Sequence, residues 1–284
     1  MIKGGEKMQF FETEPVSLYL SKLTEIETIK SAKQNINLYQ HPWLGKVLVI
    51  NGEIQHVEEY QSLYHEMLVH FPITFIPIVS NVLILGGGSL FAAYEVLKYS
   101  SVESVVLCDY DNSVIELMIK YYPHARAVYE DKRFCYVEMD ANTYIKNTSN
   151  KFDLVINDCF NLSERSNITK VSYYTLLSKL CTSYGLCVDI IYRHIFDKQT
   201  TIDALNYLRR ENNTIFSLVC VPEYPGILHV ETIWGKSKFL SQTNSTIINN
   251  IQKTDNPSLY KYYSPRLLPY YLYLPPYIKE KFNL

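Results

Sequence analysis

The sequence lacks three features that would place it in other classes of protein. It has no excess of positive charge, since 27 Lys and Arg residues stand against 29 Asp and Glu residues. Without surplus cations to replace phosphate counterions, binding to a nucleic-acid polymer is not expected. It has no apolar run near the roughly 18 residues of a membrane span, and its N-terminus has no apolar signal segment. We therefore expect a cytoplasmic protein that does not bind membranes.

The six cysteines lack the spacing of a metal or disulfide site. There is no C-x-x-C pair and no His-rich metal spacing. Several cysteines lie in apolar, strand-like runs, so we expect reduced core residues and no bound metal.

Short β-rich runs fill the first part of the chain. "NINLYQ", "KVLVING" and "EIQHVE" read as strands, and the Asn51-Gly52 pair is a hairpin signal. From Tyr60 the apolar spacing becomes helical, and Pro72 is expected to break that helix. The pattern predicts a small N-terminal β-strand domain over residues 1–60.

Strands and helices alternate over residues 61–284. The runs "VLIL", "SVVLCDYD", "FCYVEMD", "DLVINDCF", "LCVDIIY", "SLVCVPEY" and "LHVETIWGK" predict strands. Helical spacing predicts helices over Leu90–Tyr99, Ser113–Tyr121, Tyr173–Leu180 (capped by Gly185) and Thr200–Arg209. Apolar strands that are each followed by a helix indicate a parallel sheet covered on both faces. The sequence therefore predicts an α/β protein with a Rossmann-like second domain.

The candidate ligand residues lie where predicted strands end, as expected for doubly wound sheets. Gly86, Gly87 and Gly88 follow "VLIL" and allow close backbone approach to a ligand, or simply a tight turn. Asp109 ends the next strand, about 20 residues later, where a carboxylate can accept two ribose hydroxyls. Asp140 can accept from an adenine amino group. Because the phosphate-type G-x-G-x-x-G is absent, S-adenosyl compounds are favoured over NAD.

Asp158 follows the apolar run "LVIN". A carboxylate at this strand end lies at the mouth of the predicted cleft, where it can act as a general base or cap a loop.

The chain resembles the spermidine synthase (polyamine aminopropyltransferase) family over nearly its whole length. The resemblance is carried by "GKVLVINGEIQHVEEYQSLYHEMLVHFP", "LILGGGSLFAAYEVLKYSSVESVVLCDYD", "VEMDANTYI", "FDLVINDCF", "VPEYPGILHV" and "LYKYYSPRLLPYYLYLP". It implies a β-domain beside a Rossmann-like domain, usually in a homo-oligomer. It also implies decarboxylated S-adenosylmethionine as donor of an aminopropyl group, moved by direct displacement at the carbon beside the sulfonium.

The resemblance also implies residue roles. The donor would be held by Gln34, Gln55, Gly86, Gly87, Gly88, Ser89, Asp109, Asp140 and Ala141. Tyr64 and His65 would face the reacting chain, with core packing as the alternative reading. Asp158 would orient or deprotonate the nucleophile, and Tyr224 would line the acceptor channel.

Several family carboxylates are missing here. The family motif GGGDGG is "GGGSLF" here, so Ser89 replaces its aspartate. The family motif DSSDP is "DCFNL" here, so Asn161 replaces its second aspartate. Arg193 and His194 follow a strand end that has lost its usual glutamate. Because a buried ammonium needs a partner, dicationic putrescine is expected to bind poorly. Ser89, Arg193 and His194 can instead face an anion, unless Arg193 is a surface residue and Ser89 only caps a helix.

These departures favour transfer of a 3-aminopropyl or 3-amino-3-carboxypropyl group, from decarboxylated or intact S-adenosylmethionine, to a non-polyamine, anionic acceptor. A peptidyl nucleotide would fit, because the microcin C maturation enzyme (MccD-like) of the wider family modifies such a phosphate, in antibiotic biosynthesis. The alternatives are a divergent true spermidine synthase, a methyltransferase and a catalytically inactive binding subunit. We expect a homodimer.

Overall fold

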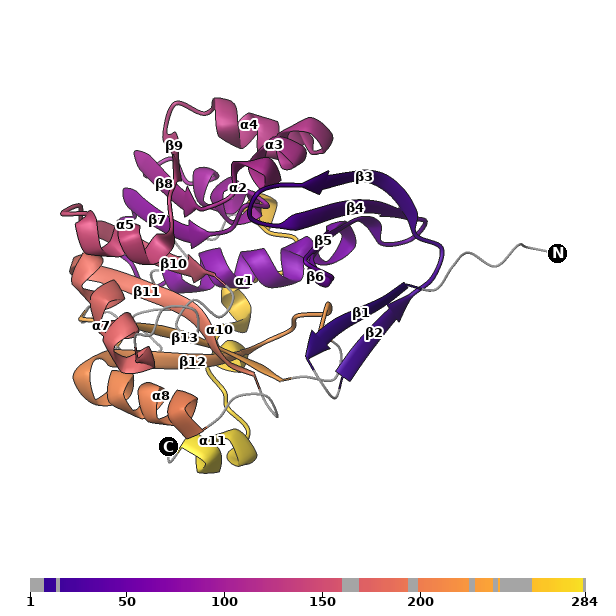
Figure 1. Ribbon diagram of the computed structural model, residues 1–284. Helices are drawn as coiled ribbons and strands as arrows, with labels where there is room; N and C mark the ends of the chain where they lie inside the picture. Colours follow the sequence, from indigo (N-terminus) through magenta and orange to yellow (C-terminus); the bar gives the residue numbers. More distant parts are fainter. Residues whose placement is uncertain are drawn as a thin grey trace.

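The computed structural model describes residues 8–13, 16–159, 169–193, 199–224, 228–236, 240 and 257–282. The strands form a two-stranded, a four-stranded and a seven-stranded sheet (Figure 1). The two-stranded hairpin, β1 (Met8–Thr13) and β2 (Val16–Leu20), projects beside the four-stranded sheet.

The four-stranded sheet is an antiparallel meander made of consecutive strands. They are β3 (Thr24–Lys30), β4 (Asn35–His41), β5 (Gly45–Ile50) and β6 (Glu53–Val57). The predicted hairpin turn joins β5 to β6, and both of its residues, Asn51 and Gly52, have positive φ. Alternate residues such as Leu38 and Leu48 pack into the main core, while Val47 contributes to a smaller cluster. The predicted N-terminal strands are confirmed.

The large sheet has the order β12-β13-β11-β10-β7-β8-β9. Its strands are β7 (Asn81–Gly86), β8 (Ser104–Asp109), β9 (Phe134–Glu138), β10 (Phe152–Asp158), β11 (Cys181–Arg193), β12 (Asn213–Val219) and β13 (His229–Gly235). The pairs from β9 to β11 are parallel, but β13 runs antiparallel to both of its neighbours. The α/β fold class is confirmed, and the expected parallel sheet is in fact mixed, because β13 is antiparallel to its neighbours.

Helices cover both faces of this sheet (Figure 1). One face carries α1 (Gln61–Ile73), α2 (Phe91–Leu97), α3 (Asn112–Tyr121) and α4 (Pro123–Glu130). The other carries α5 (Ala141–Asn147), α7 (Lys170–Leu180), α8 (Gln199–Glu211) and, near the end of the chain, α11 (Pro276–Phe282). In β7, Val82 and Ile84 face the first layer while Leu83 and Leu85 face the second. This explains why the strand is apolar at every position.

Two expectations about element ends are wrong. Pro72 does not break α1 but lies inside it, in its last turn. Gly185 does not cap α7, because α7 ends at Leu180 and Gly185 lies within β11. A Cβ on Gly185 would lie 2.6 Å from the carbonyl oxygen of Phe152. The glycine therefore permits the close approach of β10 and β11.

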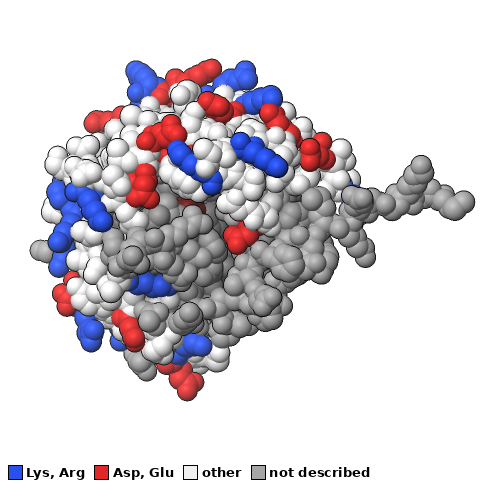
Figure 2. Space-filling model, viewed as in Figure 1, with Lys and Arg blue, Asp and Glu red and all other residues white. Residues whose placement is uncertain are grey.

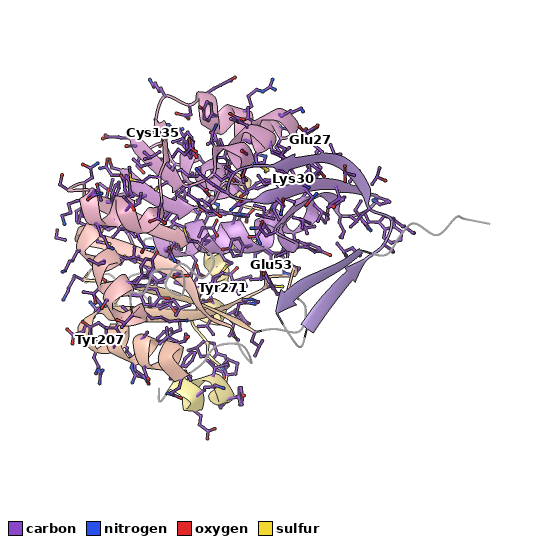
Figure 3. The ribbon with its side chains drawn as sticks, in the orientation of Figure 1. Glu27, Lys30, Glu53, Cys135, Tyr207 and Tyr271 are labelled. Carbon is purple, nitrogen blue, oxygen red and sulfur yellow. The ribbon has the colours of Figure 1, made fainter. Side chains whose placement is uncertain are left out.

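The four-stranded sheet lies over the carboxyl ends of the central strands. The short 3-10 helix η1 (Glu58–Tyr60) links the four-stranded sheet to α1. The apolar face of this sheet shares one core with α1 and β7. The domain boundary at residue 60 stays a prediction. Figure 3 shows Glu53, the first residue of β6, at the inner edge of this sheet, toward the large sheet. The site lies between these two layers.

Charged side chains of both signs are interspersed on the face seen in Figure 2, most clearly over its upper part. This mixture agrees with the net charge of −2. Within the described residues, no helix is both long and apolar enough to cross a bilayer.

Candidate active site

A cavity of about 330 Å³ lies where the four-stranded sheet meets the carboxyl ends of β7, β8, β10 and β11. Every site residue expected from the sequence whose side chain is described lines this cavity. These residues are Gln34, Gln55, Tyr64, His65, Gly86, Gly87, Gly88, Ser89, Asp109, Asp140, Ala141, Asp158 and Tyr224. The fold therefore brings them together, although their individual roles stay predictions.

The glycine turn after β7 forms the floor of the cavity. Gly86 and Gly87 have φ values of 75° and 74°, which favour glycine. A Cβ on Gly86 would lie 2.6 Å from the carbonyl oxygen of Asp158, and one on Gly88 would lie 3.2 Å from Oδ2 of Asp109. Glycine here lets the backbone of Asp158 and the carboxylate of Asp109 approach the turn at the end of β7 closely.

Asp109 ends β8 and is partly buried at the edge of this floor. Burial raises the pKa of its carboxyl, while the backbone N–H groups of Asp111, Tyr110 and Gly88 act in the opposite direction. The N–H of Asp111 lies 3.1 Å from Oδ1. These contacts orient the carboxylate toward the space above the glycine turn.

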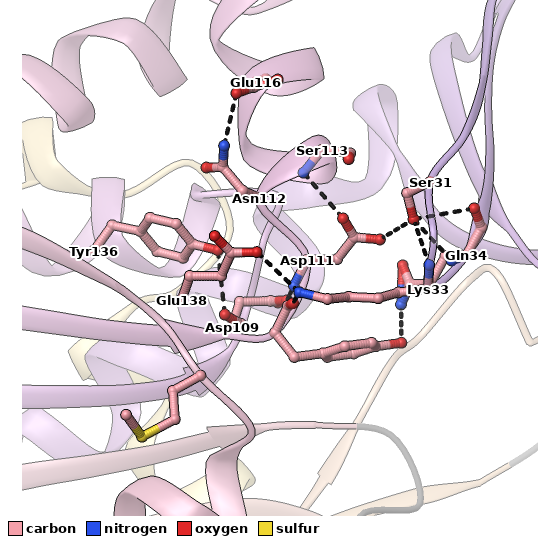
Figure 4. Close-up of polar contacts among 12 residues, drawn as sticks. Ser31, Lys33, Gln34, Asp109, Asp111, Asn112, Ser113, Glu116, Tyr136 and Glu138 are labelled. Atoms are coloured by element: carbon pink, nitrogen blue, oxygen red, sulfur yellow. Dashed lines mark hydrogen bonds and ion pairs between the residues drawn. The ribbon is translucent and has the colours of Figure 1, made fainter.

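The turn that begins β4 is tied to the end of β8 (Figure 4). The Ser31 hydroxyl donates to Oδ2 of Asp111 over 2.6 Å, and Asp111 also caps α3. Lys33 pairs with Glu138 at 2.8 Å, and both side chains are substantially exposed. The first contact fixes the N-terminal sheet over the candidate ribose position.

Gln34 extends from this turn into the cavity. Its Nε2 donates to the hydroxyl of Tyr110. Its Oε1 is buried and has no hydrogen-bond partner within the described parts of the chain. A buried amide oxygen without a partner is suited to accept a ligand hydroxyl. Gln55, by contrast, lines the cavity from an exposed position on β6.

Asp140 is the N-cap residue of α5. Its Oδ1 accepts from the backbone N–H of Thr143 at 3.0 Å and from the Thr143 hydroxyl at 3.2 Å. Helix capping thus explains part of its role, and the adenine contact stays a prediction. Ala141 follows as the first residue of α5 and is buried.

Asp158 and Tyr64 form the pair at the centre of the site. The Tyr64 hydroxyl donates to Oδ1 of Asp158. Burial raises the pKa of Asp158 to about 7, the hydrogen bond from Tyr64 lowers it, and the charge of Asp109 raises it. Burial likewise holds the pKa of Tyr64 well above its usual value. A carboxyl that titrates near neutrality in a cleft is a candidate proton acceptor.

His65 lies beside this pair within a cluster of aromatic rings. Its Nδ1 is 2.9 Å from the carbonyl oxygen of Gln61, and burial lowers its pKa to about 4. Phe91, which stands where the family has glycine, stacks on His124 at 3.7 Å and on His56 at 4.4 Å between ring centroids. His65 is therefore neutral near pH 7 and packs as part of the wall.

The candidates at the acceptor end are described only in part. Asn161 and His194 lie outside the described residues, and so does the side chain of Arg193, whose backbone ends β11. Ser89 lines the cavity, and among the described residues its hydroxyl makes only a long 3.5 Å contact with the N–H of Phe91.

Three acidic residues of the cavity wall were not expected from the sequence: Glu53, Asp189 and Glu223. Asp189 is buried within β11 and accepts from the side-chain amide of Asn157 at 2.6 Å. Strand periodicity could have indicated the face of Asp189, but not that this face opens onto a cavity.

Glu223 follows β12 and is 7% exposed. Burial raises its pKa to about 7, against the opposing effect of the backbone N–H groups of Glu223 itself and Val57. Its Oε2 makes no hydrogen bond to any described residue. In the sequence, only the neighbouring Tyr224 was marked by the resemblance.

The lining as described is acidic. It includes six carboxylates and, among the described residues, no lysine or arginine; the carboxylates belong to Glu53, Asp109, Asp140, Asp158, Asp189 and Glu223. In the described ranges, no three His, Cys, Asp or Glu side chains gather as metal ligands would. The site thus offers proton acceptors and cation partners from its own side chains.

The chain is similar in sequence to known aminopropyltransferases. The family model described as "Spermine/spermidine synthase domain" matches residues 61–279. The polyamine aminopropyltransferase of Buchnera aphidicola (strain Tuc7) is 28% identical over 257 residues, covering 89% of this chain and 90% of that protein. Polyamine aminopropyltransferase 1 of Aquifex aeolicus is 40% identical over 129 residues, 45% of this chain and 46% of that protein.

Two solved structures share the fold. Spermidine synthase from Thermotoga maritima has a TM-score of 0.85 at 25% identity, covering 98% of this chain and 94% of that one. A spermidine synthase in complex with the transition state analogue AdoDATO has a TM-score of 0.86 at 24% identity, covering 98% and 95%. Together with the match of the family model to most of its length, this shows that the chain belongs to the spermine/spermidine synthase family and is a transferase of the aminopropyl type.

Proposed function

We propose that the protein transfers a 3-aminopropyl group from decarboxylated S-adenosylmethionine to an amine. The observation that carries this proposal is the half-buried Asp158–Tyr64 pair, with the Asp158 pKa near 7, in a cavity lined by carboxylates. A base of this kind is required for an ammonium acceptor, which must lose a proton before its nitrogen can attack.

The residues of the cavity fit the proposed donor. The glycine turn from Gly86 to Gly88 leaves space for an adenosyl group close to the backbone, with Asp109 at the ribose. The Oε1 of Gln34, which has no partner among the described residues, is a second acceptor for a ribose hydroxyl. The donor's sulfonium is cationic, so the surrounding carboxylates also favour its binding.

In the proposed reaction, the amine lies at the Asp158–Tyr64 pair. Asp158 accepts a proton from the amine, and Tyr64 holds the carboxylate in position through its hydrogen bond. The nitrogen lone pair then forms a bond to the donor carbon beside the sulfonium, the carbon–sulfur bond breaks, and its electron pair returns to sulfur. The products are the alkylated amine and 5′-methylthioadenosine. The main contribution of the site is orientation and proton transfer.

The charge of the residues that line the cavity affects which acceptor can bind. The sequence favours an anionic, non-polyamine acceptor, because Ser89 and Asn161 replace carboxylates of the family. The described cavity nevertheless keeps six carboxylates, and a phosphate among them would be repelled. We therefore favour an amine acceptor, as the polyamine aminopropyltransferase relatives suggest.

A second candidate function rests on Ser89. With no carboxylate at this position, the cavity can admit the carboxyl group of intact S-adenosylmethionine. The protein would then transfer a 3-amino-3-carboxypropyl group to an anionic acceptor such as a peptidyl nucleotide, in the manner of the MccD-like enzyme. Restoring the acid with Ser89→Asp should shift affinity toward the decarboxylated donor by about 1–3 kcal/mol. An unchanged ratio of the two dissociation constants would reject this candidate.

One assay separates the two functions. Purified protein is incubated with each donor in turn, together with 1,4-diaminobutane or a peptidyl nucleotide, and products are identified by mass spectrometry. We expect aminopropylated amine from the decarboxylated donor alone. A product that forms only from intact S-adenosylmethionine and the nucleotide would establish the second function instead.

We also propose that the enzyme is a cytoplasmic homodimer, as the family resemblance implies. Light scattering on the purified full chain tests the assembly.

A further inference from the structure

Two of the six cysteines lie against each other, outside the cavity. All six are free thiols. The sulfur atoms of Cys181 and Cys187 are 3.3 Å apart, with one thiol donating to the other. Neither residue belongs to the cavity lining, and the proposed reaction gives neither of them a role. Their contact therefore needs a separate explanation.

An irregularity at the start of β11 brings the two residues together. The register of β11 against β10 shifts just after Cys181, so the strand bulges there. Within the bulge, a Cβ on Gly185 would lie 3.1 Å from the Cβ of Cys181. Cys181 is therefore folded back onto the strand that carries Cys187, which brings the two side chains into contact.

The two thiols differ in their access to solvent. Cys181 is half-buried where α7 ends, whereas Cys187 is 0% exposed, in the core between the sheet and α7. An oxidant in solution can therefore reach Cys181 first. Burial and then the hydrogen bond with Cys181 raise the pKa of Cys187 well above its usual value, so little Cys187 thiolate is present at neutral pH.

We propose that Cys181 and Cys187 form a redox modification site, at which a small disulfide such as oxidised glutathione converts them to an intramolecular disulfide. The Cys181 thiolate attacks the small disulfide, a mixed disulfide forms, and one glutathione thiolate leaves. Cys187 then gives its proton to a thiolate in solution and attacks the sulfur of Cys181, and the second glutathione leaves. The two protein thiols lose two electrons and two protons, and the small disulfide is reduced to two thiols.

The disulfide joins α7 to a strand that forms part of the cavity wall. The two sulfurs must approach by about 1 Å to reach the length of a disulfide bond. Asp189, two residues beyond Cys187 on the same face of β11, lines the cavity. Its carboxylate accepts from Asn157, which in turn accepts from Tyr173 of α7, over 2.6 Å in each case. The proposed disulfide therefore links the same two elements that hold Asp189.

Mass spectrometry of the folded, full-length protein tests the proposal without turnover, so its outcome is independent of the proposed function. The reduced protein is incubated with millimolar oxidised glutathione, and the remaining thiols are then alkylated in urea. Chymotrypsin cleaves after Tyr184, between the two cysteines, so the linked peptides separate only on reduction. We expect the link between Cys181 and Cys187 in most of the wild-type protein within hours, and faster at about pH 8 than at about pH 7.

Two variants define the order of the steps. Cys187→Ala should keep one glutathione on Cys181, because no second thiol can displace it. Cys135→Ala removes an exposed cysteine from β9 and is the matched control, which should form the link as the wild-type protein does. If Cys187→Ala does not fold, Cys181→Ala takes its place and should leave the buried Cys187 unmodified.

Three outcomes would overturn the proposal. The first is that both thiols of the wild-type protein stay free after incubation. The second is a stable mixed disulfide on Cys181 of the wild-type protein, because Cys187 would then be unable to displace the glutathione. The third is a link that forms only when the protein is unfolded in urea, because the folded chain would then hold the two sulfurs in an unreactive arrangement.

Discussion

At the scale of single residues, the candidate base Asp158 should lower the free energy of unfolding near and above neutral pH. The pKa of Asp158 is raised to about 7 in the folded protein, above its usual value of 3.8. A raised folded pKa means that the contribution to stability is present at low pH and is lost as the pH rises through about 7. Asp158→Asn should therefore stabilise the protein by about 2–4 kcal/mol near pH 8 and by less near pH 5. Thermal unfolding at the two pH values measures this difference.

The same variant should lower turnover of an amine acceptor by about 10²–10⁴, since asparagine cannot accept the proton. It keeps an oxygen for the Tyr64 hydroxyl, so the fold should be unchanged. A variant that is both fully active and no more stable would show that Asp158 neither accepts the proton nor has a raised pKa.

A second carboxyl, outside the cavity, also should cost stability. Glu231 in β13 is fully buried, and neither of its oxygens has a hydrogen-bond partner in the described segments. Burial raises its pKa well above the usual value. Glu231→Leu, which has a similar volume, should stabilise the protein by about 1–3 kcal/mol. Urea unfolding with an unchanged m-value would show this, whereas a loss of stability would reveal a partner for the carboxyl.

At the scale of elements, Glu66 should anchor the C-terminal part of the chain to α1. Its fully buried carboxylate accepts from the backbone N–H groups of Lys261, Tyr262 and Tyr263 over 2.7–3.0 Å. Glu66→Ala leaves these three donors without their acceptor, so we expect a loss of about 3–5 kcal/mol in urea unfolding. Glu130→Ala, at an exposed end of α4, is the control and should change stability by less than about 0.5 kcal/mol. Equal effects of the two changes would contradict the anchor.

The elements also show what local sequence can predict. Most strands and the longer helices follow from hydrophobic spacing, because each buries a face of fixed period. α4 was missed because Pro123 is also a good stop signal, and α5 because its short "ANTYIKN" sequence contains poor helix formers. The direction of β13 cannot be read from its residues, since a buried strand has the same pattern in either direction.

At the scale of the whole molecule, the sequence predicts those site residues that lie at the carboxyl ends of strands. Asp109 and Asp158 were found because parallel strands end at one edge of a sheet. Glu223 was not, because only the packing of the loop after β12 against β6 brings it into the cavity. Residues such as Glu223 line the cavity only through contacts between distant parts of the chain, and no local sequence pattern predicts those contacts.

The cluster of histidine and aromatic rings beside the cavity should make the whole molecule sensitive to acid. Burial lowers the pKa of His65 and His124 to about 4, and that of His56 well below its usual 6.5. A lowered folded pKa means that stability is present above about pH 6.5 and is lost as the pH falls toward 4, by up to about 3 kcal/mol for each histidine. Glu58 and Glu95 oppose this shift at His124, and Lys46 adds to it. His124→Phe, which can keep the stack on Phe91, should flatten the fall in stability between about pH 6.5 and 4.5, as measured by urea unfolding. If the variant and the wild-type protein lose stability equally over this range, His124 is already solvated and protonated, and the packing argument fails.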